Sequence, residues 1–400
     1  MSAAHFQYNT SLTQQLKGKS VKTDTNLFVG QRLGEGTYSA SYLCMINGEY
    51  KIIRMFKYMG PNDRLDMKLN NIRKELAALE QLNATSANAP ASVADKLAKL
   101  NVALRNIEYT GPIDEKGEQL FWADQPITDG NDQFVAYQIC KHIPGRSLAQ
   151  IQGNERADPA FAIAIGEQLG RILAQFHHAA AEVSFPYYRT MAELKGNDHA
   201  YRHVRMAVDR STAKADHDDD AVAYQEIAEM IDENTERLFY SPQFHTPIHG
   251  DLGLGNIIVE FGQLTGIVDW DKARRSLPEY DFRGITLMPA AFDSAIASYF
   301  TELKKLGHHE HPPKYIKIFK ATALKLALAV HTACACAPET DAYRLARGEN
   351  NAWDREKMAV SIIVDQLAKL DPAYIGAAAA MRSHTKELRE KYPHLQHCVT

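Results

Sequence analysis

The sequence predicts an α+β protein with two lobes, in which a small antiparallel β-sheet with one helix precedes a larger, mainly helical lobe. Residues 26–58 alternate short apolar runs with turn residues, as successive antiparallel strands do. From residue 145 onward, apolar residues recur mostly at helical spacing. The 400 residues also exceed what one hydrophobic core usually organises. We therefore place the two domains at residues 1–140 and 141–400.

The first lobe begins with strands joined by turns, and Asn47 to Glu49 carry a hairpin signal. Residues 64–85 place apolar side chains at helical spacing, which predicts the one helix of this lobe. Residues 119–148 predict two more strands around an Asp/Gly-rich turn. These strands end at Pro144 and Gly145, so the lobes change near this point.

The second lobe begins with a helix over residues 158–180, whose apolar stripe faces a core. Residues 256–271 interrupt the helical pattern with a strand, a glycine turn and a second strand. The chain beyond Arg283 is expected to be helical. The segment between Ser184 and Ser241 is longer than a minimal lobe of this kind needs.

Composition excludes several classes of protein. Lys and Arg total 45 against 49 Asp and Glu, and this net charge of −4 does not indicate a nucleic-acid partner. The N-terminus has no apolar core typical of a signal peptide, and no stretch approaches the apolar length of a membrane span. We therefore expect a cytoplasmic protein without a membrane partner. Oligomeric state is left open.

A glycine-containing turn, "LGEGTYSASY", joins the first two strands. Gly34 and Gly36 would let the backbone approach a phosphate, and the hydroxyls of Thr37 and Ser39 could bind its oxygens. An ordinary hairpin turn is the alternative. A dinucleotide-binding fold is disfavoured, because a strand rather than a helix follows the turn.

The segment "HGDLGLGNIIV" places Asp251 and Asn256 at the spacing of a kinase catalytic loop. Asp251 can orient the proton of an attacking hydroxyl, while Asn256 can reach a magnesium ion. We expect Gly253 and Gly255 to let the chain turn tightly. Turn capping by the Asp and the Asn is the alternative interpretation.

A third motif, "GIVDWD", ends a strand with Asp269, where a carboxylate is well placed to bind the metal that bridges nucleotide phosphates. Taken singly, each of the three motifs has an ordinary structural explanation. Their order along the chain, with the change of lobe between the first and the second, makes coincidence improbable.

With these motifs the sequence resembles the aminoglycoside phosphotransferase and choline kinase superfamily, from about Phe28 to Phe282. The resemblance implies a bilobal protein-kinase-like fold, Asp251 as the catalytic aspartate, and Asn256 and Asp269 as magnesium ligands. Asp281 in "YDF" would brace the catalytic loop.

The resemblance also implies nucleotide contacts in the first lobe. Arg54 in "YKIIRMF" takes the position of the phosphate-contacting cation, with Lys57 as a competitor. Glu75 would pair with that cation, with Glu80 as a less favoured alternative. A solvated helix face is the alternative for the cation and Glu75. The backbone from Gln138 to Cys140 would bind the adenine edge.

These expectations describe a magnesium-dependent phosphotransferase that uses ATP or GTP and acts on a hydroxyl of a small molecule, such as an aminoglycoside or an amino alcohol. Asp271, Glu279 and the acidic run at residues 216–220 are candidate substrate contacts, and the run could attract a cationic acceptor. Two alternatives are a protein Ser/Thr kinase and a non-catalytic nucleotide-binding scaffold.

Overall fold

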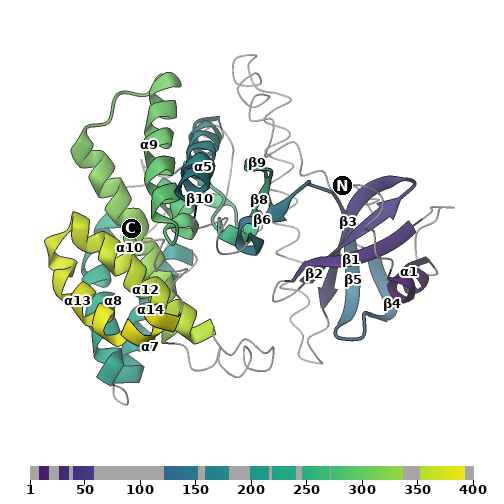
Figure 1. The fold of residues 1–400 in the computed structure, drawn as a ribbon, viewed down its shortest axis with the longest axis horizontal. Helices are drawn as coiled ribbons and strands as arrows, with labels where there is room; N and C mark the ends of the chain where they lie inside the picture. The colour runs from purple at the N-terminus through teal and green to yellow at the C-terminus, as the bar shows by residue number, and fades with distance from the viewer. Residues whose placement is uncertain are drawn as a thin grey trace. The chain divides into compact units, whose positions relative to one another are not determined.

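The computed structural model describes residues 9–17, 27–35, 39–57, 121–151, 158–179, 199–215, 219–239, 246–270, 272–336 and 352–391. These residues belong to two compact units, the first ending at Pro144 and the second beginning at Gly145 (Figure 1). The helix expected over residues 64–85 lies outside the described residues.

The first unit contains a five-stranded antiparallel sheet. Its strands lie in the order β1 (Leu27–Glu35), β2 (Ser39–Ile46), β3 (Glu49–Lys57), β5 (Gln133–Lys141) and β4 (Phe121–Thr128). The predicted hairpin is confirmed, because Asn47 and Gly48 have φ angles of 52° and 86° and join Ile46 to Glu49. This turn needs two left-handed residues, which Asn-Gly supplies at low cost.

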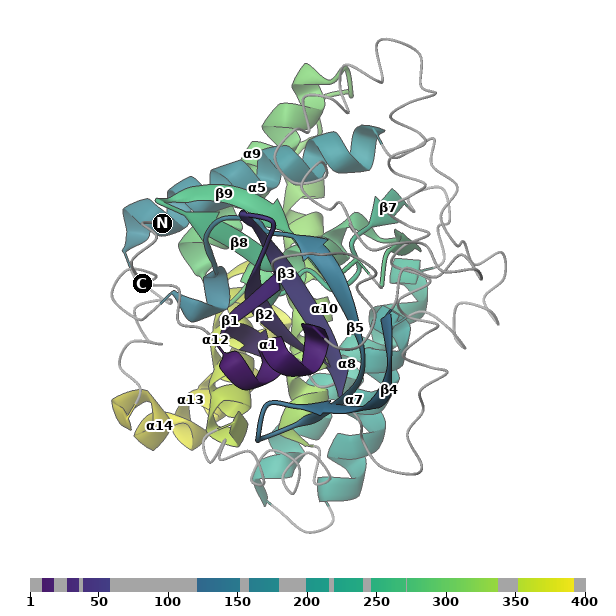
Figure 2. The ribbon, with the colours of Figure 1, turned by 90° about the vertical axis from the view of Figure 1, so that its right-hand side faces the viewer.

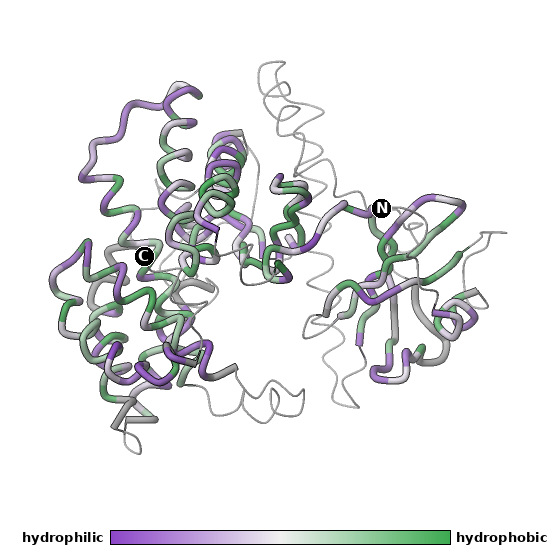
Figure 3. Tube along the Cα trace, in the orientation of Figure 1, coloured by the Kyte–Doolittle hydropathy of each residue, from purple (hydrophilic) through white to green (hydrophobic). Residues whose placement is uncertain are grey.

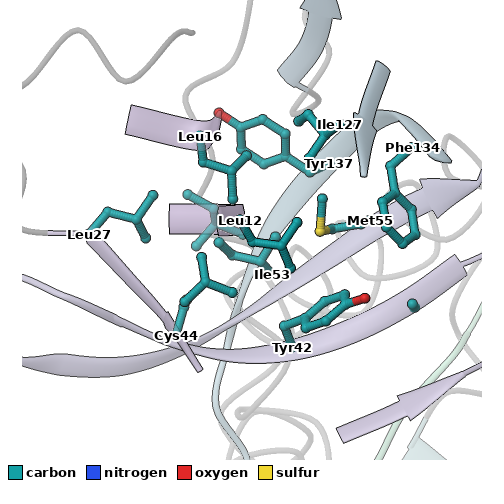
Figure 4. Close-up of a cluster of buried hydrophobic side chains, with 13 residues drawn as sticks. Leu12, Leu16, Leu27, Tyr42, Cys44, Ile53, Met55, Ile127, Phe134 and Tyr137 are labelled. Atoms are coloured by element: carbon teal, nitrogen blue, oxygen red, sulfur yellow. The ribbon is translucent and has the colours of Figure 1, made fainter. Parts of the chain in front are cut away.

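A short helix, α1 (Thr10–Lys17), which the sequence did not indicate, covers one face of this sheet. Leu12 and Leu16, one helical turn apart, are fully buried against the strands (Figure 4). Asn9 caps the helix by accepting a hydrogen bond from the Leu12 N–H at 3.0 Å. The buried cluster includes Tyr42, Cys44, Ile53, Met55, Ile127, Phe134 and Tyr137.

The second unit is organised around two long helices, α5 (Pro159–Ala179) and α9 (Pro289–Lys305). The predicted stripe on α5 is buried at all positions except Ile172, which is half-buried. Gly166 and Gly170 let the two helices approach closely, because a Cβ at either position would overlap backbone atoms of Ala291 or Ala295 on α9. The two glycines therefore set how tightly α5 and α9 pack.

Short strands of the second unit frame the segment with the two later motifs. Strands β8 (Ile257–Glu260) and β9 (Gln263–Ile267) form the predicted hairpin beside α5 (Figure 2), and β6 (Arg146–Ser147) pairs with β8. The Gln168 side chain on α5 fixes this hairpin by bonding the Gly262 carbonyl at 3.0 Å and the Leu264 N–H at 2.9 Å. Strands β7 (Thr246–Ile248) and β10 (Arg274–Ser276) form a separate antiparallel pair.

The remaining helices confirm the helical character of this lobe. The segment between Ser184 and Ser241 contributes α7 (His199–Ala215) and α8 (Asp219–Phe239), which pack on each other and on α10 (Pro313–Ala335). Beyond α10 come α12 (Ala352–Leu370), α13 (Ile375–His384) and α14 (Lys386–Lys391). The connection from α9 to α10 is hydrophilic (Figure 3). Short 3₁₀ helices are η2 (Leu148–Gln150), η5 (Leu254–Asn256), η6 (Pro278–Ile285) and η7 (Pro372–Tyr374).

Helix α10 is long and apolar enough to cross a membrane, judged by length and composition alone, whereas no such stretch was expected from the sequence. Its most apolar 18-residue window is 61% buried inside the fold. A core helix of a globular domain has the same properties, so a single such helix among the described residues is weak evidence for a membrane span.

Candidate active site

The loop that follows β7 turns at Gly250 and again over η5, where the Asn256 N–H donates to the Gly253 carbonyl at 3.0 Å. Gly250 has φ +81°, and a Cβ there would overlap Arg274 Nη1 and the Lys272 carbonyl. Gly253 has an ordinary φ of −97°, and a Cβ at Gly253 or Gly255 would meet no atom within 4 Å. The chain does turn tightly between Gly253 and Asn256, as expected, but neither the open space around Gly253 and Gly255 nor the φ of Gly253 requires a glycine there.

Asp281 braces this loop, as the resemblance implied. Its fully buried carboxylate accepts hydrogen bonds from the His249 and Gly250 N–H groups, each at 2.9 Å, and contacts His177 Nε2 at 3.1 Å. Burial alone raises the pKa of Asp281, but the bond from His177 and the nearby His249 and Gly250 N–H outweigh it. The pKa of Asp281 therefore lies below its usual value.

The His249 ring fixes the position of Asp251 within the loop. His249 Nε2 lies 2.9 Å from the Val268 carbonyl and must donate, so Nδ1 accepts the Asp251 N–H at 3.2 Å. The ring also packs on Trp270, with centroids 4.5 Å apart. His249 thus serves as a support, and the Asp251 carboxylate is the exposed functional group of the loop, with its side chain 43% exposed.

The two predicted metal ligands are brought side by side. The Val268 N–H donates to the Asn256 carbonyl at 3.0 Å, which places Asp269 next to Asn256 at the end of the hairpin. The Asn256 amide nitrogen donates to the Asp251 carbonyl at 2.8 Å, so the amide oxygen points away from this bond. Asp269 has φ +68°, in the left-handed region that few non-glycine residues adopt and that aspartate tolerates better than most.

This arrangement fits magnesium better than a transition metal. An amide oxygen and a carboxylate are hard ligands, and Mg²⁺ uses one or two such groups together with water and phosphate oxygens. Among the described residues no group of three or more His, Cys, Asp or Glu side chains is placed to hold a metal. Asn256 and Asp269 can therefore form a magnesium site that substrate phosphates complete.

A guanidinium that the sequence did not indicate contacts the predicted catalytic aspartate. Arg283 Nη2 lies 2.5 Å from Asp251 Oδ1. The two residues are 32 positions apart in the chain, so no local motif connects them. Only the folded path of η6 beside the loop brings them together.

In the first unit, the two candidates for the phosphate-contacting cation have different surroundings. Arg54 projects from the face of β3 opposite to the buried Ile53 and Met55, and its Nε lies 3.3 Å from the Ser39 hydroxyl. Lys57 is 6% exposed, and its Nζ forms an ion pair with Asp132 at 3.1 Å. The geometry thus favours Arg54, and it groups Arg54 with Ser39 of the predicted phosphate turn.

The remaining predicted nucleotide contacts are partly described. Gly34 lies near the end of β1, opposite Ser41, and a Cβ there would meet no atom within 4 Å. Gln138 and Cys140 lie on β5, paired with Arg54 and Ile52 of β3. The other predicted positions, Gly36, Thr37, Glu75 and Asp271, lie outside the described residues.

Comparison with known proteins agrees with this architecture. No curated protein matches the sequence. Among solved structures, a microcompartment-associated aminopropanol kinase is 14% identical and has a TM-score of 0.50, covering 90% of this chain and 97% of the other. Aminoglycoside phosphotransferase APH(4)-Ia, solved with ADP and hygromycin B, is 13% identical, with a TM-score of 0.45 and coverage of 85% and 93%.

The likeness to the aminopropanol kinase shows the fold, an antiparallel sheet unit and a helical unit as in kinase-like proteins. The family model described as "Phosphotransferase enzyme family" (APH) matches residues 64–311, which is more than half of the chain and includes the loop from His249 to Asn256. The chain therefore belongs to the APH phosphotransferase enzyme family.

Proposed function

We propose that this phosphotransferase transfers the γ-phosphate of ATP or GTP to a hydroxyl of a small molecule, such as an amino alcohol or an aminoglycoside. The observation that carries the proposal is the geometry of the loop after β7. It presents the Asp251 carboxylate to solvent, and the backbone bond from Val268 to Asn256 brings Asp269 next to Asn256 along the hairpin.

Each residue has one task in this proposal. Asp251 accepts a hydrogen bond from the acceptor hydroxyl and orients its oxygen for in-line attack on the γ-phosphate. Arg54 and the turn that contains Gly34 and Ser39 bind phosphate oxygens. Asn256 and Asp269 would hold a magnesium ion, which neutralises phosphate charge when bound.

A protein kinase is disfavoured by the path between the third motif and Asp281. Residues 272–281 contain β10, which pairs with β7, and the start of η6. Within these described residues there is no segment long enough to act as an activation loop. A non-catalytic scaffold would have no need for Asp251, Asn256 and Asp269 together.

The test is turnover of ATP and of GTP with magnesium, for the wild type and Asp251→Ala, against amino alcohols, aminoglycosides, choline, homoserine, sugars and a protein substrate. We expect an acceptor-dependent rate that Asp251→Ala lowers by about 10²- to 10⁴-fold. Nucleotide binding without turnover on any acceptor would favour the scaffold, and a rate on protein alone would favour the protein kinase.

A further inference from the structure

Helix η6 contacts the first four residues of the catalytic loop, from His249 to Leu252. Asp281 holds the backbone N–H groups of His249 and Gly250, as described above. Gly284 lies against the Leu252 carbonyl so closely that a Cβ would overlap it. Between these two contacts, Arg283 reaches the side chain of Asp251. Arg283 is thus the residue of η6 that acts on the functional group itself.

The Arg283 side chain is held firmly. It is 13% exposed, and its guanidinium carbon lies 4.6 Å from the centre of the Tyr280 ring. The buried Nε has no hydrogen-bond partner among the described atoms, so the bond from Nη2 to Asp251 is the hydrogen bond that fixes the guanidinium. A planar cation stacked on a ring has few alternative conformations.

This contact distinguishes the two oxygens of Asp251. Oδ1 accepts the charge-assisted bond from Arg283 at 2.5 Å, while no described group bonds Oδ2. A carboxylate fixed through one oxygen can rotate little, so its second oxygen keeps a defined direction. That direction determines where an acceptor hydroxyl is held relative to the phosphate.

We propose that Arg283 is a positioning residue, which fixes Oδ1 of Asp251 and leaves Oδ2 to receive the acceptor hydroxyl. This inference rests on the proposed function, in which Asp251 orients that hydroxyl. Arg283 acts through Asp251 alone, so its loss lowers kcat and leaves the KM for the nucleotide unchanged.

The test compares kcat and KM of the wild type with Arg283→Gln, Arg283→Lys, Asp251→Asn and the double variant Asp251→Asn/Arg283→Gln, using the acceptor found in the panel above. We expect Arg283→Gln to lower kcat roughly 10- to 100-fold, with the nucleotide KM within about twofold of the wild type. Arg283→Lys keeps the charge and should recover part of the loss. In the Asp251→Asn background, Arg283→Gln should cause no further loss, because coupled residues are not additive.

Arg382→Gln is the matched control. Its guanidinium pairs with Asp365 at 2.7 Å in the same unit, away from the loop, so kcat should stay at the wild-type level. Thermal melts verify that each variant folds. If Arg283→Gln does not fold, kcat of Arg283→Lys is compared with that of the wild type instead. A wild-type kcat in Arg283→Gln, or an undiminished loss in the double variant, overturns the inference alone. A wild type without turnover on any acceptor overturns the proposed function as well.

Discussion

At the scale of single residues, Glu279 on η6 is in a costly position. Its Oε2 is buried and has no hydrogen-bond partner among the described residues. Its negative charge also contributes to raising the pKa of Tyr299 and Tyr315. Burial raises the pKa of Glu279 from 4.5 to about 7. Between these two pH values the folded protein binds more protons at this site than the unfolded chain, so stability falls as pH rises from about 4.5 to about 7.

We therefore expect Glu279→Gln to raise the free energy of unfolding at pH 8 by about 1 to 3 kcal/mol, and by much less at pH 5. Glu302→Gln is the matched control, because Glu302 bonds Gln175 and Lys305 and its pKa is lowered although burial opposes this. It should lose stability at pH 8. Denaturant titrations at the two pH values measure both, and an equal gain for Glu279→Gln at pH 5 and pH 8 would contradict the assignment.

The site residues that were predictable from the sequence are those whose roles follow from local spacing. Asp251, Asn256 and Asp269 stand in short motifs, and the structure places them together. Arg283 and Gly250 were not recognised, because their importance comes from neighbours distant in sequence or from the φ angle that a turn demands. Spacing does not report either property.

At the scale of elements, α5 and α9 pack closely because Gly166 and Gly170 have no side chain. We expect Gly170→Ala to destabilise the protein by about 2 to 3 kcal/mol, because the new methyl group would overlap the Ala295 backbone. Gly376→Ala on α13 is the matched control, since a Cβ there meets nothing within 4 Å, and it should stabilise by about 0.5 kcal/mol. Urea unfolding measures the change in the free energy of unfolding for the two variants. Equal changes would show that α9 moves to make room for the methyl group at position 170.

Elements with a strong local signal were predicted, whereas α1 was not. The Asn-Gly hairpin and the turn at residues 261–262 were predictable because each contains a glycine, which adopts the left-handed conformation that such a turn needs. Helix α1 has eight residues and two buried leucines, which is too short to give a clear helical period. Its stability comes from packing on the sheet and from the Asn9 cap, and the sheet surface is not visible in the local sequence.

At the scale of the whole molecule, ligand binding should appear as a gain in stability. A non-hydrolysable ATP analogue with magnesium, at about 100 times its Kd, should raise the free energy of unfolding by about 2.7 kcal/mol. Asp269→Asn should keep the gain from nucleotide alone and lose the additional gain from magnesium. Asp293→Asn, an exposed carboxylate on α9, serves as the control. Thermal melts with and without magnesium measure the additional gain in stability. If Asp269→Asn gains as much from magnesium as the wild type, Asp269 is excluded as a ligand.

The contacts of η6 also limit how this part of the gene can vary during evolution. Asp281 contacts His249 and Gly250, Arg283 contacts Asp251, and Gly284 contacts Leu252. An inserted or deleted residue between Asp281 and Gly284 would rotate the later positions by about a third of a 3₁₀ turn and separate them from their contacts. Within this stretch, drift among descendants should proceed through substitutions, and length changes should accumulate in the hydrophilic connection between α9 and α10.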